Sequence, residues 1–554
     1  MNTNIKINSL TKELIFFIVL YILSFAINFL NINLPHFDWL NYKFYDVWAF
    51  LNNRTSIDFA PAGFRTYFSN LSEIINYFFI TKFNSHPILF IAINSINIPI
   101  LIYIVYKIST YLFKDNLFFV YFAVLVALFQ PLLFFERGFG YNDITVAIPI
   151  LLSFYLLIKN LFIGNSKTRN LYLFLSGAII GTAFVLKPTT IVYCFTVILS
   201  FLVLFKKLDK PLFVFLYFML GFISSFILID GVFRYTVYKQ FSNPFFPYFQ
   251  NIFFSQYAKD ANIIGFDYSI LRPKEIFEVI FYPFLKSNAN TQFGDQWGVV
   301  DIRIPIAYVF SVVSLLLFVF KNIMKDKYNA NYLINDNLFI FLLFFIILSY
   351  LINMLTFGVY RYIIASCSLF GILYIIVLYQ IFSVLNLNEK YKKRIIYIFL
   401  SFLFLIIIIF TGILNAEISF SIPKISKIIE IKDYSIQDNS TVFVSVSGSS
   451  YIIPFLNKNA KYHLWNVATF EKNVFNDKFT NVNIEILKNP FKKKYIIFRT
   501  ADYKDFNIDL PKEITQYAGS QSNQFNIINC HDFDTKFFSE NLEHIRMICE
   551  IKNK

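Results

Sequence analysis

Residues 395–410 read IIYIFLSFLFLIIIIF and contain no charged side chain, and the five residues before them read KYKKR. The apolar span continues to about residue 414, and roughly 20 apolar residues suffice for a helix to cross the hydrocarbon core of a bilayer. Lysine and arginine next to such a span stay on the cytoplasmic side. This stretch predicts a transmembrane helix that starts in the cytoplasm and places the rest of the chain on the opposite side.

Ten further spans pass the same length test, and Lys187-Pro188 divides two of them: 14–32, 88–113, 117–135, 144–162, 171–187, 189–205, 211–230, 303–320, 338–356 and 362–384. Apolar residues make up 57% of the chain, charged residues 15%, and the mean hydropathy is +0.56. This composition predicts a polytopic α-helical membrane protein with about eleven transmembrane helices. The first span has no small-residue cleavage site before Asn33, so we interpret it as an uncleaved helix.

The basic residues predict the orientation of these spans. With the N-terminus in the cytoplasm, every cytoplasmic connection is basic: Lys107 and Lys114; Lys167 and Arg169; Lys206, Lys207 and Lys210; Lys321, Lys325 and Lys327; Lys390, Lys392, Lys393 and Arg394. The formal charge of +14 is thereby accounted for by topology, and we expect no nucleic-acid partner. The abundance of Phe, Tyr, Ile, Asn and Lys is typical of AT-rich bacterial genomes, so we expect a bacterial inner membrane.

Two domains follow from this topology. Residues 1–415 form the membrane module, with outer loops 33–87 and 231–302, and residues 416–554 form a periplasmic domain. In the first loop, amphipathic segments at Tyr45–Leu51 and Leu71–Phe83 predict helices along the membrane surface. In the tail, a small α/β domain is predicted by one helical and three strand-like segments: Tyr451–Leu456, Thr441–Val446, Tyr495–Phe498 and Ile545–Ile551.

Cys530 and Cys549 are the two cysteines outside the predicted spans. The topology places them in an oxidising compartment, where disulfides persist. Cys530 follows an apolar run and Cys549 lies in a predicted strand, so neighbouring strands would bring them within bonding distance. We expect a Cys530–Cys549 disulfide.

Acidic and cationic side chains gather at the predicted outer ends of the spans. Asp38 follows the first span, and Glu136 and Asp143 share a very short outer loop. The cations are Lys187 and Arg361, and Tyr362 directly follows Arg361. A carboxylate can accept a hydroxyl proton or hold a metal, and cations can hold a phosphate. The alternative is that each acid is a solvated helix cap. Two acidic loops and two cations on one face favour a site for transfer from a lipid phosphate.

The chain resembles the GT-C superfamily of integral-membrane glycosyltransferases. Asp38 matches the acidic position in the first outer loop of that superfamily, and Asn142-Asp143 matches its second acidic motif. Closer similarity to a little-characterised group of bacterial multi-pass proteins is carried by further stretches: Asp38–Tyr42, Asp58–Ala62, Thr66–Asn70, Tyr141–Asp143, Val185–Lys187 and Phe241–Tyr248.

The resemblance implies transfer of a sugar from a polyprenyl-phosphate donor to a cell-envelope glycan, lipid or protein acceptor on the periplasmic face, within the membrane lipid. Asp38 would be the general base, Asp143 and Glu136 would position the acceptor, and Arg361, Lys187 and Tyr362 would bind the donor phosphate. If a divalent cation (Mg²⁺ or Mn²⁺) takes part, Asp38 and Asp143 are its ligands. Asp38 stands alone where several families have an acidic pair, which leaves metal dependence open.

Two other functions compete with this interpretation. A polysaccharide polymerase or ligase acting on undecaprenyl-diphosphate glycans would also carry large outer loops, but it would rely chiefly on arginine and histidine. A transporter would place ionisable groups at mid-membrane. The predicted spans carry almost no charge away from their ends.

Overall fold

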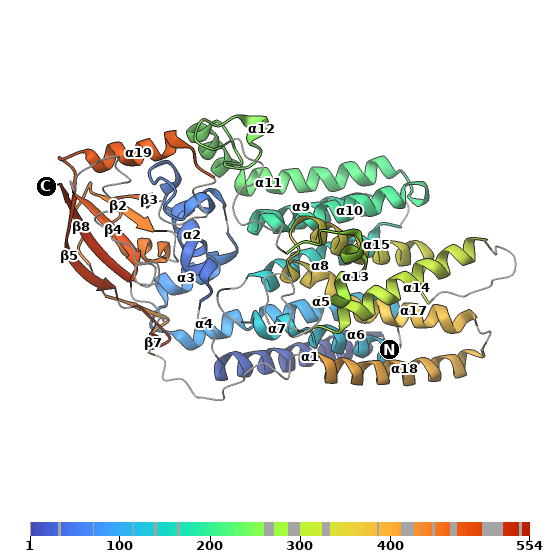
Figure 1. The fold of residues 1–554 in the computed structure, drawn as a ribbon. Coiled ribbons are helices and arrows are strands. Elements are labelled where there is room, and N and C mark those ends of the chain that lie inside the picture. Colours follow the sequence, from blue (N-terminus) through green and yellow to red (C-terminus); the bar gives the residue numbers. More distant parts are fainter. Residues whose placement is uncertain are drawn as a thin grey trace.

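The computed structural model describes residues 2–31, 35–69, 71–114, 116–137, 140, 142–162, 167–259, 271–285, 300–323, 333–384, 387–411, 426–432, 434–445, 449–465, 474–500, 525–533, 535–541 and 546–553. A bundle of long helices occupies one part of the molecule, and a β-sheet with the C-terminus lies beyond one end of it (Figure 1). The expected domain boundary at residues 415 and 416 lies outside the described residues.

The predicted spans coincide with helices: α1 Asn2–Leu30, α4 Pro87–Asn94, α5 Asn97–Phe113, α6 Leu117–Leu128, α7 Pro131–Phe135, α8 Asp143–Asn160, α9 Lys167–Leu186, α10 Ile191–Val203, α11 Pro211–Phe241, α14 Arg303–Ile323, α15 Asp336–Thr356, α16 Ile364–Cys367, α17 Phe370–Val384 and α18 Glu389–Phe410. Among the described residues, eight helices are long and apolar enough to cross a membrane. A ninth span results if Tyr360–Cys367 and Phe370–Ser383, bent by 54°, are counted together. Spans 117–135 and 189–205 are covered by shorter helices, α6 and α10, of 12 and 13 residues.

Small residues allow α9 and α11 to pack at close range. A methyl group on Gly177 of α9 would lie 1.9 Å from the carbonyl oxygen of Phe218, and one on Gly221 of α11 would lie 2.0 Å from that of Phe174. Glycine is favoured at such contacts because it lets two helix backbones approach each other. The α9–α11 pair thereby fixes the position of Lys187, which follows the last residue of α9.

The segment between α1 and α4, which the sequence predicts as the first outer loop and which we call the first outer segment, contains the predicted helices, but only one of them suits a membrane surface. The π-helix η1 (Trp39–Lys43) leads into α2 (Phe44–Leu51), and the 3-10 turn η4 (Leu71–Glu73) leads into α3 (Ile74–Lys82). The exposed Ile75 and Phe78 of α3 suit a membrane surface. The prediction was wrong for α2, because its residues 44–49 are all buried between the bundle and the C-terminal domain.

The C-terminal region is a small α/β domain, as the sequence predicts. Its main sheet has the order β3-β2-β4-β8-β5, formed by β3 (Lys461–Trp465), β2 (Thr441–Ser445), β4 (Lys494–Arg499), β8 (Arg546–Asn553) and β5 (Phe525–Phe533). Strand β2 is parallel to β3 and β4, and β8 is antiparallel to β4 and β5. Helix α19 (Asp477–Lys488) packs beside the sheet, and a second sheet has the order β1-β6-β7: Ile429–Ile431, Thr535–Phe537 and Glu540–Asn541.

A disulfide joins Cys530 of β5 to Cys549 of β8, with the two Cα atoms 4.1 Å apart. The register between these strands shifts from Ile528 to His531, so Asn529 and Cys530 together face Cys549. Such an extra residue is a β-bulge, and Asn529 adopts a positive φ of 51° within it. The disulfide therefore closes the bulge between two neighbouring strands.

The domain is anchored on the first outer segment by apolar packing and by hydrogen bonds. Trp39 and Trp48 share one buried cluster with Tyr451, in the 3-10 helix η10 (Ser450–Phe455), and with Tyr462 of β3. Phe59 adds to the free edge of β3 through two backbone hydrogen bonds of 2.8 Å, one to Tyr462 and one from Leu464. These contacts place the sheet beside α2, which lies between the sheet and the helical bundle (Figure 1).

A buried ion pair completes this anchor. Arg54 Nε donates to Asp58 at 3.0 Å, and the guanidinium also donates to the backbone oxygens of Lys458 and Ala460 at 2.7 and 2.6 Å. Asp58 in turn accepts from the Tyr462 backbone at 3.0 Å. Asp58 has a structural role, because its charge joins the loop to the sheet domain.

Candidate functional site

Four segments that are distant in sequence meet where the helical bundle faces the outer segments. Asp38 follows α1, Asp143 is the first residue of α8, Lys187 lies between α9 and the 3-10 helix η5 (Pro188–Thr190), and Arg361 lies in the 3-10 helix η8 (Tyr360–Ile363). Pro188 explains the position of Lys187, because the residue before a proline is disfavoured in helical geometry. Lys187 accordingly adopts an extended conformation, with φ −155° and ψ 109°.

Arg361 bridges the two predicted acids. One terminal nitrogen lies 3.5 Å from Asp38 Oδ2, and the other lies 3.6 Å from Asp143 Oδ2. Lys187 Nζ pairs with the other oxygen of Asp143 and lies 4.7 Å from the centre of the Tyr362 ring. The structure therefore brings together five of the side chains that the sequence analysis selected, as one alternating cluster of acids and cations.

Lys43 is a member of the site that the sequence analysis missed. Its Nζ donates to the backbone oxygen of Gly140 and to Asn142 Oδ1, both at 3.2 Å, and only 1% of the residue is exposed. The sequence held a signal for Lys43, because a lysine in a segment that is expected on the outer side departs from the rule that places lysines on the cytoplasmic side. Lys43 ties η1 to the loop that carries Asp143.

The electrostatics around Asp38 favour its charged form. Burial alone would raise the pKa of the Asp38 carboxyl, but Arg361, Lys43 and Arg65 outweigh that effect and hold the pKa well below its usual range. His36 Nδ1 accepts from the Asp38 backbone N–H at 3.3 Å, and burial lowers the pKa of His36 to about 4. At neutral pH the pair is a carboxylate beside an uncharged imidazole.

The cluster is open to its surroundings mainly at Asp38. The Asp38 side chain is 17% exposed, whereas the side chains of Arg361 and Asp143 are 8% and 2% exposed. Behind Arg361 and Tyr362, a cavity of about 10 Å³ is lined by Asp143, Thr189 and Tyr193. That volume holds at most about one water molecule. A ligand would therefore reach Asp38 first and would have to displace side chains to reach Asp143.

A second buried network holds Arg361 in place. Tyr360, the residue before it, donates its hydroxyl to Asp301, which also accepts from Arg303 Nε at 2.8 Å. Arg303 is fully buried, donates to the Val126 backbone oxygen at 2.9 Å, and accepts at its own backbone oxygen from Tyr374 at 2.7 Å. This network fixes η8 against α6, α14 and α17, so Arg361 is presented from a rigid support.

Two parts of the sequence prediction remain: the position of Glu136, and whether Asp38 and Asp143 fit a divalent cation. Glu136 is buried at the C-terminal end of α7, in the connection that leads to Asp143 at the start of α8. No three His, Cys, Asp or Glu side chains of the described residues gather as a metal ligand set. Asp38 and Asp143 direct their carboxylates at Arg361, so this donor set does not fit a resident divalent cation.

The chain matches no family model, and comparisons with curated proteins and with solved structures find no match either. The fold and the site define a mostly helical protein whose apolar helices are compatible with a polytopic membrane protein, with a small α/β domain at its C-terminus and a charged cluster where the two parts meet.

Proposed function

We propose that this protein is a membrane glycosyltransferase of the GT-C type that transfers a sugar from a polyprenyl-phosphate donor to a cell-envelope glycan, lipid or protein acceptor on the periplasmic face of the inner membrane. The observation that carries the proposal is the bridge from Arg361 to Asp38 and Asp143, with Lys187 on the far side of Asp143. It combines a proton acceptor with two phosphate-binding cations at one end of the bundle.

The proposed reaction is a displacement at the anomeric carbon of the donor sugar. The acceptor oxygen forms a bond to that carbon, its proton passes to Asp38, and the bond between the anomeric carbon and the phosphate oxygen breaks. The polyprenyl phosphate leaves with the bonding electrons, and its charge is neutralised by Arg361 and Lys187. Tyr362 would hold the ammonium of Lys187 against its ring face. No nucleotide and no metal takes part in any of these steps.

The ion pairs suggest how donor binding prepares Asp38 to act as a base. In the structure, Arg361 contacts Asp38 and keeps the pKa of its carboxyl low, which makes it a weak base. A donor phosphate that takes over Arg361 would remove this contact and raise the pKa of Asp38 toward the working pH. The phosphodiester becomes a more highly charged monoester when the sugar leaves, so the cations interact more strongly with the product phosphate than with the donor.

The polymerase or ligase remains the second candidate, because Arg361, Arg65 and His36 surround Asp38 and could serve a diphosphate leaving group. The experiment that separates the two is transfer by purified full-length protein from a defined polyprenyl-monophosphate sugar and, in parallel, from an undecaprenyl-diphosphate glycan. Transfer from the monophosphate donor supports the proposal. Transfer from the diphosphate donor alone favours the polymerase or ligase. If neither donor supports transfer, both functions are refuted.

A further inference from the structure

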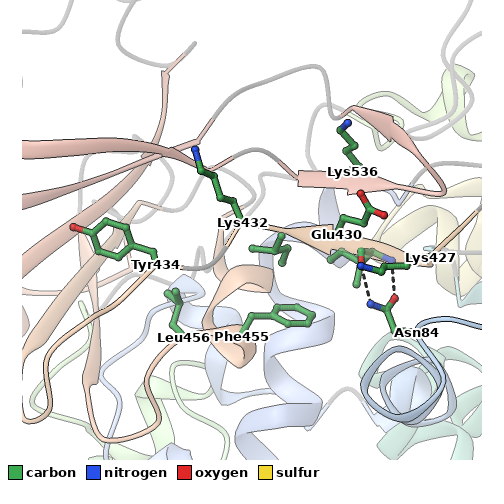
Figure 2. Close-up of a pocket in the computed structure, with 10 residues that line it drawn as sticks. Asn84, Lys427, Glu430, Lys432, Tyr434, Phe455, Leu456 and Lys536 are labelled. Atoms are coloured by element: carbon green, nitrogen blue, oxygen red, sulfur yellow. Dashed lines mark hydrogen bonds between the residues drawn. The ribbon is translucent and has the colours of Figure 1, made fainter.

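A second hollow lies in the C-terminal region, away from the charged cluster. It has a volume of about 500 Å³ and lies between Asn84, strand β1 and η10. This volume is within the range of roughly 300–1,000 Å³ that is usual for ligand pockets. Figure 2 shows its labelled lining, with Tyr434 toward one end of the view and Asn84 and Lys427 toward the other. We call this hollow the β1 groove.

The β1 groove carries more positive than negative charge. Lys427, Lys432 and Lys536 line it and are exposed, whereas Glu430 is the single acid in the lining. Glu430 and Lys536 face each other across β1 and β6, and Lys432 follows Glu430 by two residues. Within the described part of the chain, no ion pair engages any of these three lysines. Their ammonium groups are therefore available to an anionic ligand.

The groove also offers aromatic rings and a strand edge. Phe455 is 37% exposed, and Tyr434 is half-buried. Asn84 bonds with both its side-chain groups to the backbone of Ile429, at 2.8 and 2.9 Å (Figure 2). Because backbone groups on one edge of a strand recur every second residue, the N–H and C=O of Ile431 face the same edge beyond Asn84. Rings, lysines and backbone polar groups thus line one surface.

We propose that the β1 groove binds an acidic carbohydrate chain whose sugar units carry carboxylate or phosphate groups. Lysines would pair with the acidic groups, Glu430 and the backbone of Ile431 would bond hydroxyls, and Phe455 and Tyr434 would cover the apolar faces of the rings. The acyl chain of a lipid would need a continuous apolar lining, and the charged residues of this groove do not provide one. That this carbohydrate chain is the acceptor of sugar transfer rests on the proposed glycosyltransferase function, whereas its binding in the groove does not.

The groove is physically connected to the charged cluster. Phe455 stacks on Phe44, with the ring centres 5.7 Å apart, and Phe44 directly follows Lys43. Ser450, at the other end of η10, donates to the backbone oxygen of Asn41 in η1. An acidic glycan in the groove would therefore lie on the same structural unit, η10 packed on η1, that borders Asp38.

The test is a binding measurement on full-length protein in neutral-lipid nanodiscs, with no donor present. The probes are a short oligogalacturonate, a phosphorylated gluco-oligosaccharide, a neutral gluco-oligosaccharide of equal length and a soluble short-chain phosphatidylglycerol. At least one acidic oligosaccharide should bind, and added salt should weaken it because exposed charges are screened. A Lys432→Gln/Lys536→Gln variant should bind roughly tenfold more weakly, and Phe455→Ala should also weaken binding.

Lys488→Gln is the matched control, because Lys488 is an exposed lysine on α19, on the other side of the sheet domain in Figure 1. It should leave binding unchanged. Equal affinity for the neutral oligosaccharide, no binding of either acidic oligosaccharide, or an unchanged affinity in the Lys432/Lys536 variant overturns the proposal. Binding of phosphatidylglycerol in preference to both acidic oligosaccharides overturns it in favour of a lipid headgroup. A protein that binds the acidic probe but transfers no sugar refutes the proposed function alone.

Discussion

Asp38 Oδ2 lies 3.5 Å from a terminal nitrogen of Arg361, although Asp38 follows the first helix of the chain and Arg361 directly precedes α16, near the end of the bundle. The second terminal nitrogen of Arg361 reaches Asp143 at 3.6 Å. One planar guanidinium thus sets the separation of two carboxylates that come from different helices, and the following expectations depend on it.

Asp38→Asn should reduce transfer by roughly 10²- to 10⁴-fold, because the amide keeps the size of the side chain but cannot accept the acceptor's proton. Initial rates with a polyprenyl-monophosphate sugar measure this effect. The matched control is Asp532→Asn, an exposed aspartate of β5, which should be silent. Wild-type rates in a folded Asp38→Asn protein would rule out the general-base role.

Arg361→Lys should weaken donor use by roughly tenfold, since a single ammonium cannot place two nitrogens between Asp38 and Asp143 as the guanidinium does. The loss should appear as a higher donor KM together with a lower kcat. Arg394→Lys, at an exposed arginine near the start of α18, is the control and should behave like the wild type. An unchanged Arg361→Lys enzyme would show that bidentate geometry is not needed.

Asp58→Asn should destabilise the contact between the first outer segment and the sheet by about 3–5 kcal/mol, because it leaves the buried Arg54 without its charge partner. The Arg54→Met/Asp58→Leu double variant should recover part of this loss. Thermal unfolding followed by tryptophan fluorescence reports the effect, since Trp39, Trp48 and Trp465 are buried at this end of the molecule. Equal stability of Asp58→Asn and wild type would argue against the anchor.

His463 should make the sheet domain sensitive to mild acid. Burial lowers its pKa from 6.5 to about 4, with a smaller effect from Lys461 and Lys492, and its ring contacts Asn483 Oδ1 at 3.1 Å. As the pH falls below 6.5, the unfolded chain binds a proton that the folded protein excludes, so stability decreases until the pH reaches about 4. At pH 5 this loss amounts to about 2 kcal/mol.

His463→Gln should remove most of that dependence while keeping a donor for Asn483. The comparison is the fall in Tm between pH 8 and pH 5 for the wild type, for His463→Gln and for His86→Gln, an exposed histidine before α4. The His86 variant should follow the wild type. If His463→Gln shows the same fall as the wild type, another group is responsible for the acid sensitivity.

Reporter fusions should place Lys207 and Lys392 in the cytoplasm and a fusion after Asn415 in the periplasm, because lysine-rich connections stay inside. If the fusion after Asn415 reports a cytoplasmic position, the charged cluster around Asp38 does not face the periplasm as proposed.

Mass mapping without reductant is an independent check on that orientation. Cys530 and Cys549 should be recovered as one linked peptide, since their disulfide is expected to persist in the periplasm. Two freely alkylatable thiols in protein from the native membrane would contradict both the pairing and the external position of the sheet.

The sequence was sufficient to find the helices, because an apolar run long enough to span a bilayer has few other ways to satisfy its backbone. It was also sufficient to select Asp38, Asp143, Lys187 and Arg361 as groups at one end of the bundle. Their mutual contacts depend on how α8, α9 and η8 pack, which no local pattern encodes. The burial of α2 was missed for the same reason, since its covering partners Tyr451 and Tyr462 lie in the C-terminal region.

The bonds from Arg54 to Lys458 and Ala460 join residues 404 and 406 positions apart, so the first outer segment binds partners that are synthesised much later than itself. At roughly 5–20 residues per second, a ribosome needs about 20–80 s to produce the intervening chain. During that interval Trp39, Phe44 and Trp48 have left the ribosome but lack their later partners, which are Tyr451, Phe455 and Tyr462. We therefore expect a chaperone or the lipid surface to cover these aromatic residues until those partners have been synthesised.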